Sequence, residues 1–114
     1  MGDCLFCSIV GRKIPATIVL ETDKSIAFRD INPKAPVHIL VIPKEHIDNL
    51  MALTGRHADV LMDLHSTIQQ VARQEGVAEN GFRVAINNGK NAGQAVGHLH
   101  YHVLAGRKLS WPPG

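Results

Sequence analysis

The stretch His98-Leu99-His100-Tyr101-His102-Val103-Leu104 alternates histidine with bulky apolar residues. In an extended strand, successive side chains point to opposite faces of the sheet. The histidines are therefore expected on one face, and the apolar side chains on the other, where they can be buried. Neighbouring imidazoles would lie roughly 6.5–7 Å apart along the strand, which lets two of them contact one small ligand.

Histidines in strict alternation are hard to explain as packing. A lone histidine in a strand is usually a hydrogen-bonded polar residue, but imidazole is a poor strand former and is costly to bury without a partner. Near neutral pH, imidazole commonly acts as a proton switch, a base or a metal ligand. The pattern therefore indicates a functional strand rather than a purely structural one.

The composition limits the class of protein. The chain of 114 residues has room for one domain, spanning 1–114, with a core of its own. Hydrophobic residues make up 45% of the chain but aromatic residues only 4%, so the core is expected to be mostly aliphatic. The formal net charge of +2, with no basic run, argues against binding of a nucleic acid polymer but not of a single nucleotide.

The sequence contains no apolar stretch of membrane-spanning length, so no membrane association is expected. Residues 1–4 lack the charged and apolar regions of a signal peptide, and we expect a cytoplasmic protein. In that compartment Cys4 and Cys7 are more typical of thiols or metal ligands than of a disulfide. A single Cys-x-x-Cys pair is weak evidence for zinc, because a closed tetrahedral site needs four ligands.

The other strands are predicted from β-branched and apolar runs. Residues 17–21 and 25–30 flank a turn and are predicted to form a hairpin. The most hydrophobic run, 37–42, is predicted to be a central strand that Pro43 ends, and residues 81–87 form another strand. The glycine-rich loop of residues 88–94 leads into the histidine strand.

Two helices complete the prediction. A short helix falls within residues 4–13 and ends near Gly11. A long helix runs from an N-cap at Thr54 to about residue 75, where Gly76 stops it. The chain is therefore expected to be an α+β domain, an antiparallel sheet of about five strands with one long and one short helix. The residues expected on the buried face of the long helix are Ala58, Leu61, Leu64, Ile68, Val71 and Ala72.

Three further features bear on function. The glycine-rich loop is either a turn or a cradle of backbone N–H groups for an anion, and a phosphate held there would lie beside His100 or His102. Asp30, at the end of a strand, is either a turn residue or an acceptor for ribose hydroxyls. His57 and His65 are interpreted as ordinary helix residues, because no cysteine or carboxylate lies at a ligand spacing from them.

The pattern His-φ-His-φ-His-φ-φ, where φ is apolar, resembles the histidine triad (HIT) family of nucleotide hydrolases and transferases. The likeness extends over nearly the whole chain and is closest to the Hint branch. It includes residues 28–33 (FRDINP), residues 35–44 (APVHILVIPK), Gly93-Gln94 and the ending Trp111-Pro112-Pro113-Gly114. The resemblance implies the HIT fold, with the sheets of two protomers joined across a homodimer.

The resemblance also implies a mechanism. His100 matches the family nucleophile, which attacks the α-phosphorus to form a nucleotidyl-histidine that water hydrolyses, and His102 matches the histidine that binds the phosphate. Imidazole suits this role because it is a competent nucleophile and, once charged, a good leaving group. The implied substrates are purine nucleoside phosphoramidates or related AMP and GMP derivatives, with no organic cofactor. The implied nucleotide-binding residues are Asp30 for the ribose, Ile31 for the base, and Asn87, Gly93, Gln94, Ala95, His100 and His102 for the phosphate, and the implied apolar purine pocket is Phe6, Ile9, Ile14, Phe28 and Leu40.

Some members of the family hold a structural zinc ion, and their ligands match Cys4, Cys7, His46 and His98. His98 would then be a metal ligand and not a catalyst. His38 is implied as an active-site neighbour that orients the triad. Trp111 is implied as a second neighbour, in a tail that reaches the active site of the partner protomer.

The chain departs from the Hint pattern in two places. Ala95 replaces a serine whose hydroxyl helps the departing amine, which is expected to slow phosphoramidate cleavage or to shift the preferred leaving group. Gly97 replaces a residue that is commonly aromatic. Two other functions stay open: a nucleotide-binding or partner-binding dimer with weak catalysis, and a metalloenzyme that uses the three triad histidines as ligands directly.

Overall fold

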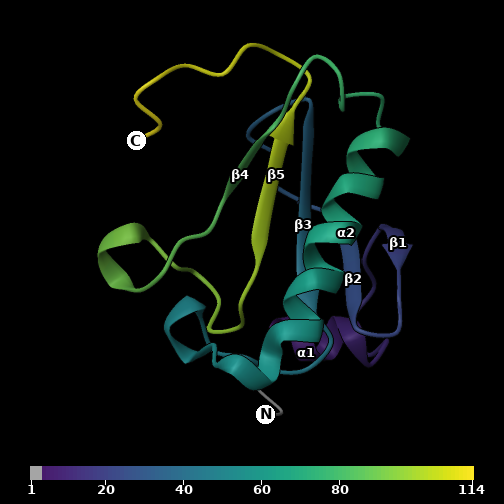
Figure 1. Ribbon diagram of the computed structural model, residues 1–114, viewed down its shortest axis with the longest axis vertical. Helices are drawn as coiled ribbons and strands as arrows, with labels where there is room; N and C mark the ends of the chain where they lie inside the picture. Colours follow the sequence, from purple (N-terminus) through teal and green to yellow (C-terminus); the bar gives the residue numbers. More distant parts are fainter. Residues whose placement is uncertain (1–3) are drawn as a thin grey trace.

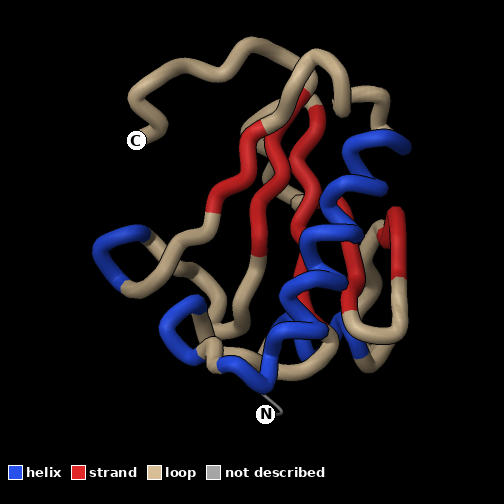
Figure 2. Tube along the Cα trace, in the orientation of Figure 1, coloured by secondary structure: helices blue, strands red, loops and turns tan. Residues whose placement is uncertain are grey.

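The computed structural model describes residues 4–114; residues 1–3, where a signal peptide would begin, lie outside the described part. Figures 1 and 2 show a twisted antiparallel sheet with helices on it, the α+β arrangement predicted from the sequence. The strands follow the spatial order β1-β2-β3-β5-β4. In chain order the elements are α1 (Leu5–Val10), β1 (Ile18–Glu21), β2 (Ser25–Arg29), β3 (Val37–Pro43), α2 (Ala58–Gln74), β4 (Arg83–Ala85) and β5 (Tyr101–Ala105), with 3-10 turns at Leu50–Ala52, Gly55–His57 and Lys90–Ala92.

The predicted alternation of the histidine segment is confirmed. The apolar side chains of the segment, Leu99, Tyr101 and Val103, join the core that packs against α2. The rings of His98 and His100 instead contact Phe6 of α1, on the opposite side of the sheet. The two helices thus cover different sides of the sheet, and α1 lies with the histidines.

The strand itself begins later than predicted, at Tyr101 rather than at His98. Pairing with β3 stops at Tyr101 opposite Val41. Further pairing is prevented because Pro43 has no N–H and its carbonyl accepts a hydrogen bond from the His98 ring, at 2.9 Å. The segment before β5 is held by another bond, from the N–H of Leu99 to the carbonyl of Ile47.

The long helix also begins differently from the prediction. Thr54 is a cap, but of a 3-10 turn, and the α-helix starts only at Ala58. Ala58 is exposed rather than buried, because the residues of α2 that pack on the sheet begin with the half-buried Val60 and Leu61. The end of the helix is as predicted, with Gly76 at a positive φ of 72°. The residues buried along the helix are Leu64, Thr67, Ile68, Val71 and Ala72.

The β4 edge of the sheet is shorter than predicted and lies beside the C-terminal tail. β4 covers only Arg83–Ala85, and its start is delayed because Gly81 has a φ of 108° that takes the chain out of extended geometry. Figure 1 shows the tail leaving β5 and running outward on the β4 side. There the ring of Trp111 is 79% exposed, with the Arg83 guanidinium 5.7 Å from its centre. None of the described helices is both long and apolar enough to cross a bilayer.

Candidate functional site

A cavity of about 270 Å³ opens on the α1 side of the sheet. Its wall is apolar except for four residues, Arg29, Asp30, His100 and His102. The structure therefore brings the second and third histidines of the triad to the edge of a hollow large enough for a small ligand. The residues that the family resemblance places around a purine all line it: Phe6, Ile9, Ile14, Phe28 and Leu40.

The ring of His100 is fixed by a backbone contact. Its Nδ1 lies 2.8 Å from the carbonyl oxygen of His98. A carbonyl can only accept, so Nδ1 carries the proton and Nε2 carries the lone pair. The ring is 6% exposed, and the Phe6 ring meets it edge-on with centroids 5.1 Å apart. The unprotonated Nε2 is thus the ring nitrogen left for chemistry.

The proton position on His102 is set by a chain of hydrogen bonds from a neighbouring strand. The backbone N–H of Lys34 donates to Nδ1 of His38 at 3.0 Å, which places the proton of the neutral His38 ring on Nε2. That Nε2–H donates to Nδ1 of His102 at 2.9 Å. His102 therefore carries its own proton on Nε2, a buried donor without a hydrogen-bond partner in the described structure.

Both of these rings are held neutral by their surroundings. Burial lowers the pKa of His102 to about 4, and the nearby His100 and His38 rings act in the same direction. Burial likewise lowers the pKa of His38, although the Asp30 carboxylate, 3.4 Å from its Nε2, opposes the shift. A neutral chain of donors is therefore the stable form near neutral pH. The His102 ring that carries the unpartnered N–H lies next to the His100 ring, with centroids 5.0 Å apart, and both rings line the cavity.

The other predicted nucleotide-binding residues divide into two groups. Asp30, Ile31 and Ala95 line the cavity, and Ile31 at its rim is 98% exposed. Asn87, Gly93 and Gln94 are not part of its wall. Trp111 does not reach the cavity of its own chain either.

Gln94 has a role that the sequence did not indicate. Its Oε1 accepts from the N–H of Gly89 at 2.8 Å. Its Nε2 donates to the carbonyls of Asp48 and Val96, at 2.9 and 3.0 Å. The side chain thus fastens the glycine-rich loop to the segment after β3, and its hydrogen-bonding groups are occupied by backbone.

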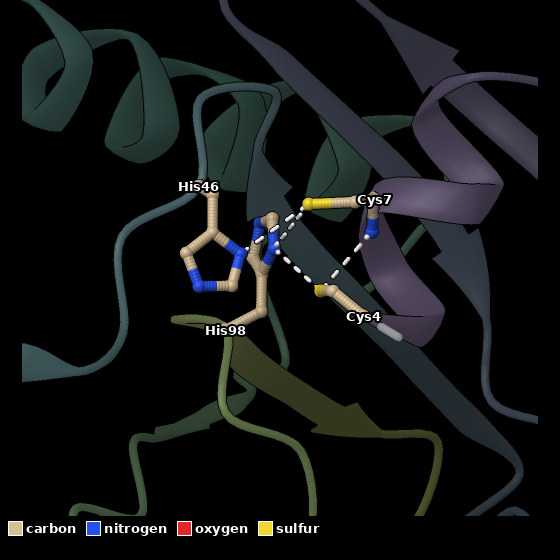
Figure 3. Close-up of side chains that lie close together, drawn as sticks. All are labelled: Cys4, Cys7, His46 and His98. Carbon is tan, nitrogen blue, oxygen red and sulfur yellow. Dashed lines mark hydrogen bonds between the residues drawn. The ribbon is translucent and has the colours of Figure 1, made fainter. Parts of the chain in front are cut away.

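Figure 3 shows the second group of predicted site residues, Cys4, Cys7, His46 and His98, pointing toward one another. They come from the start of α1, the segment after β3 and the segment before β5. Their ligand atoms all lie within 4.8 Å of one another. Nδ1 of His98 is 3.3 Å from Sγ of Cys4 and 3.6 Å from Sγ of Cys7, and Nδ1 of His46 is 3.3 Å from Sγ of Cys7.

The two histidine rings of this cluster, His46 and His98, are in the tautomer that leaves Nδ1 free to bind a metal ion. The Nε2–H of His98 donates to the carbonyl of Pro43 at 2.9 Å, and that of His46 donates to the Asp48 carboxylate at 2.8 Å. Both Nδ1 lone pairs therefore face the sulfurs. Tetrahedral zinc, with bonds of about 2.0–2.3 Å, separates its ligand atoms by roughly 3.3–3.8 Å, and the three nitrogen–sulfur distances given above fall in this range. The residues thus fit a Cys₂His₂ zinc site with its outer partners in place.

A second cluster, of Asp30, His38 and His102, lies in the cavity wall. In this cluster the Nε2 of His38 carries a proton and donates it in a hydrogen bond to Nδ1 of His102. The two nitrogens therefore do not offer two lone pairs to a metal ion. A metal ion at this point would have to displace that proton. The triad itself does not converge as a ligand set, since the His98 ring belongs to the cysteine cluster.

The other two histidines behave as interpreted from the sequence. His57 is buried and its Nδ1 accepts from the N–H of Thr54, which caps the turn before α2. His65 is exposed on α2, and its Nε2 lies 3.3 Å from the hydroxyl of Tyr101. Neither side chain belongs to the cavity wall or to the cysteine cluster.

Comparison with known proteins connects these features to a family. The sequence profile of the HIT domain matches residues 11–109. The chain belongs to the HIT domain family. A HIT family hydrolase from Legionella pneumophila Philadelphia 1 superposes with a TM-score of 0.96 at 42% identity, covering 98% of this chain and 100% of that one. The HIT fold predicted from the sequence is thereby confirmed.

Two relatives of the chain are named for an enzymatic activity and for zinc binding, respectively. Adenylylsulfatase HINT1 of Arabidopsis thaliana is 48% identical over 96% of this chain and 76% of its own length. The 14 kDa zinc-binding protein of Brassica juncea is 47% identical over 98% of this chain and 100% of its own length. The chain is similar to both over almost its whole length.

Proposed function

We propose that the protein is a hydrolase of purine nucleoside monophosphate derivatives that acts through a nucleotidyl-His100 intermediate. The observation that carries the proposal is the pairing of an unprotonated Nε2 on His100 with an unpartnered Nε2–H on His102, at one polar edge of an apolar cavity. A nucleophile beside a preorganised donor is the arrangement that substitution at phosphorus requires. The Arabidopsis and Legionella relatives, named as an adenylylsulfatase and a hydrolase, agree with this reaction class.

In the first step, the lone pair on Nε2 of His100 forms a bond to the α-phosphorus. The bond from phosphorus to the leaving group breaks, and that group departs with the electron pair. A departing amine takes its proton from water, because Ala95 in the cavity wall has none to give. In the second step, water attacks the same phosphorus, the P–N bond to His100 breaks with its electron pair returning to Nε2, and the proton lost by the attacking water passes to solvent.

The remaining residues of the cavity have binding roles in this proposal. The Nε2–H of His102 donates to a phosphate oxygen, where negative charge grows during the reaction. The Asp30 carboxylate accepts from the ribose hydroxyls, and Ile31 covers the base at the cavity rim. Asn87, Gly93 and Gln94 act on the phosphate through the glycine-rich loop, with Gln94 holding that loop in shape. His38 fixes the tautomer of His102.

Cys4, Cys7, His46 and His98 would hold a zinc ion with a structural role. When bound, the ion supplies four bonds that tie the start of α1 to the segments on either side of the sheet centre. The relative named as a zinc-binding protein supports this assignment. The free thiols of Cys4 and Cys7 also agree with a cytoplasmic location.

We further propose that the chain is a single HIT domain that forms a homodimer through the β4 edge of the sheet. At this edge Phe82 and Val84 are 36% and 40% exposed, although both are large and apolar. The exposed Trp111 lies on the same side, attached to the tail that the dimer would place beside the partner's cavity. Sedimentation equilibrium measures the mass, and a single chain mass contradicts the dimer.

The catalytic proposal is tested by mass spectrometry after mixing with an adenosine phosphoramidate and acid-free quenching. We expect a nucleotide mass on the peptide that contains His100, and its loss in His100→Ala. That variant should lose turnover while AMP binding largely survives. Normal turnover by His100→Ala contradicts the nucleophile assignment.

Ala95 favours a second function, a nucleotide-binding dimer with weak catalysis, because the cavity lacks a side-chain hydroxyl at this position. Tight AMP binding without release of product from any adenosine monophosphate derivative supports that reading. In the hydrolase reading, Ala95→Ser should instead raise the rate on phosphoramidates more than on adenylyl sulfate, since sulfate leaves without a proton.

A further inference from the structure

His98 contributes to both halves of the site, through different atoms. Its Nδ1 faces the sulfurs of Cys4 and Cys7, while its backbone carbonyl accepts from Nδ1 of His100. We propose that the Cys4–Cys7–His46–His98 cluster positions the nucleophile and the nucleotide cavity, so that metal binding and nucleotide binding reinforce each other. The proposal rests on the proposed function for the identity of the nucleotide and the nucleophile.

The first connection runs through the backbone of residue 98. The His98 side chain is fully buried and has two anchors, the carbonyl of Pro43 on Nε2 and the cysteine cluster on Nδ1. Loss of the metal would leave the Nδ1 side held only by weak contacts to the cysteine sulfurs, at 3.3 and 3.6 Å, in place of a coordination bond. The carbonyl that holds the tautomer of His100 belongs to this same residue, at 2.8 Å from Nδ1. A shift of the residue-98 backbone, once its side chain is held less firmly, would therefore move the carbonyl that fixes the nucleophile.

The second connection runs through α1. Cys4 caps this helix and Cys7 lies in its first turn, so the cluster holds both ends of one short helical turn (Figure 3). Phe6 lies between the two cysteines in the sequence and contacts both the His98 and His100 rings, with centroids 5.8 and 5.1 Å away. Phe6 also forms part of the cavity wall. A six-residue helix has little stability of its own, so its place in the wall depends on these anchors.

The third connection runs through His46 to the glycine-rich loop. The Nε2–H of His46 donates to the Asp48 carboxylate, and the Asp48 carbonyl accepts from Nε2 of Gln94. Gln94 in turn accepts from the N–H of Gly89. The cluster is therefore linked to the nucleophile, to the apolar wall and to the loop by separate contacts. Each link joins it to a different part of the proposed nucleotide site.

The coupling can be measured on the loaded protein. Co²⁺ in place of zinc gives visible absorption bands that depend on the ligand geometry. We expect these bands to shift when the cobalt protein is saturated with AMP, although AMP itself is expected in the cavity and not at the closed cluster. By linkage, the metal should tighten AMP binding by at least about fivefold, the lower end of ordinary coupling between two sites. Unchanged bands at AMP saturation overturn the proposal.

A second measurement needs no nucleotide. Long-range ¹H–¹⁵N NMR distinguishes which nitrogen of His100 carries the proton. We expect one tautomer, protonated at Nδ1, in the zinc protein, and a mixture after chelation that zinc addition reverses. The same single tautomer in a folded metal-free protein overturns the proposal. If chelation unfolds the chain, the cobalt measurement still decides the matter.

A control variant separates positioning from general stability. Asp63 of α2 accepts hydrogen bonds from the hydroxyls of Thr22 and Ser25, on the face of the sheet away from the cluster. Asp63→Asn should lower the melting temperature but leave the cobalt shift and the His100 tautomer unchanged. If Asp63→Asn abolishes both signals, metal removal would act through stability alone, which contradicts the proposal. Failure of AMP to bind the zinc protein at all would refute the proposed function instead, while the tautomer measurement still tests the coupling.

Discussion

Replacing His38 tests the hydrogen-bond chain that is proposed to make His102 a donor. In the structure, Nδ1 of His38 accepts a hydrogen bond from the N–H of Lys34, and Nε2–H of His38 donates one to Nδ1 of His102. His38→Ala removes that donor, so His102 is no longer committed to keeping its proton on Nε2. The preference of His102 for the tautomer protonated on Nε2 should fall by the contribution of one buried hydrogen bond, about 0.5–1.5 kcal/mol. That loss corresponds to about a 2- to 13-fold lower rate. His102→Ala removes the donor to phosphate altogether and should cost about 10²- to 10³-fold.

The assay is rapid quench of nucleotidyl-His100 formation from an adenosine phosphoramidate, which isolates the first step. His38→Gln should keep most of the rate, because its amide can still donate to His102. In the double variant, His38→Ala should add nothing to His102→Ala, since it acts through that ring. Independent, multiplying losses in the double variant refute the reasoning. His65→Ala, which changes a histidine outside the site, serves as the matched control.

Two other perturbations follow from the structure. The pKa of His102 is about 4 in the folded chain against 6.5 in the unfolded one, so the unfolded state binds the proton first as pH falls. The free energy of unfolding should therefore be highest above about pH 6.5 and should fall by roughly 1–3 kcal/mol toward pH 4, allowing for partial solvent screening. Urea unfolding at several pH values measures the slope, which should be flatter in His102→Gln. Gly106→Ala should cost roughly 2–5 kcal/mol, because residue 106 has a φ of +94° and an added Cβ would meet Cβ of Pro36 at 2.8 Å. A urea-derived loss below about 1 kcal/mol would contradict that strain.

Local sequence patterns were enough to predict much of the fold. The alternation around His100 was enough to assign the two faces of its strand, because side-chain direction in an extended chain depends only on position. The apolar spacing from Leu64 to Val71 likewise indicated the buried face of α2. Neither inference required knowing which strand or helix packs against the segment.

Features that depend on partners distant in the sequence are absent from local patterns, and the place of His38 beside the triad came only from the family resemblance. His38 meets His102 because β3 and β5 pair with Leu40 opposite His102, a register that no local pattern contains. The late start of β5 depends in the same way on the Pro43 carbonyl being used by a side chain. Gln94 resembled a phosphate contact because it lies in a glycine-rich loop, but its amide is used by the backbone of neighbouring segments.

The opposite protonation of the two histidine clusters directs a zinc ion to the cysteine cluster rather than to the Asp30–His38–His102 group. Lone pairs converge in the cysteine cluster, whereas a ring proton occupies the centre of the Asp30–His38–His102 group. Zinc in surplus would have to expel that proton, at a place where the N–H of Lys34 already uses the other nitrogen of His38. A zinc titration should accordingly show tight binding of about one ion per chain, and that ion should be lost in Cys4→Ala but not in His38→Ala. Histidine side chains from one short segment of the chain can thus be reserved for different tasks by the placement of single hydrogens.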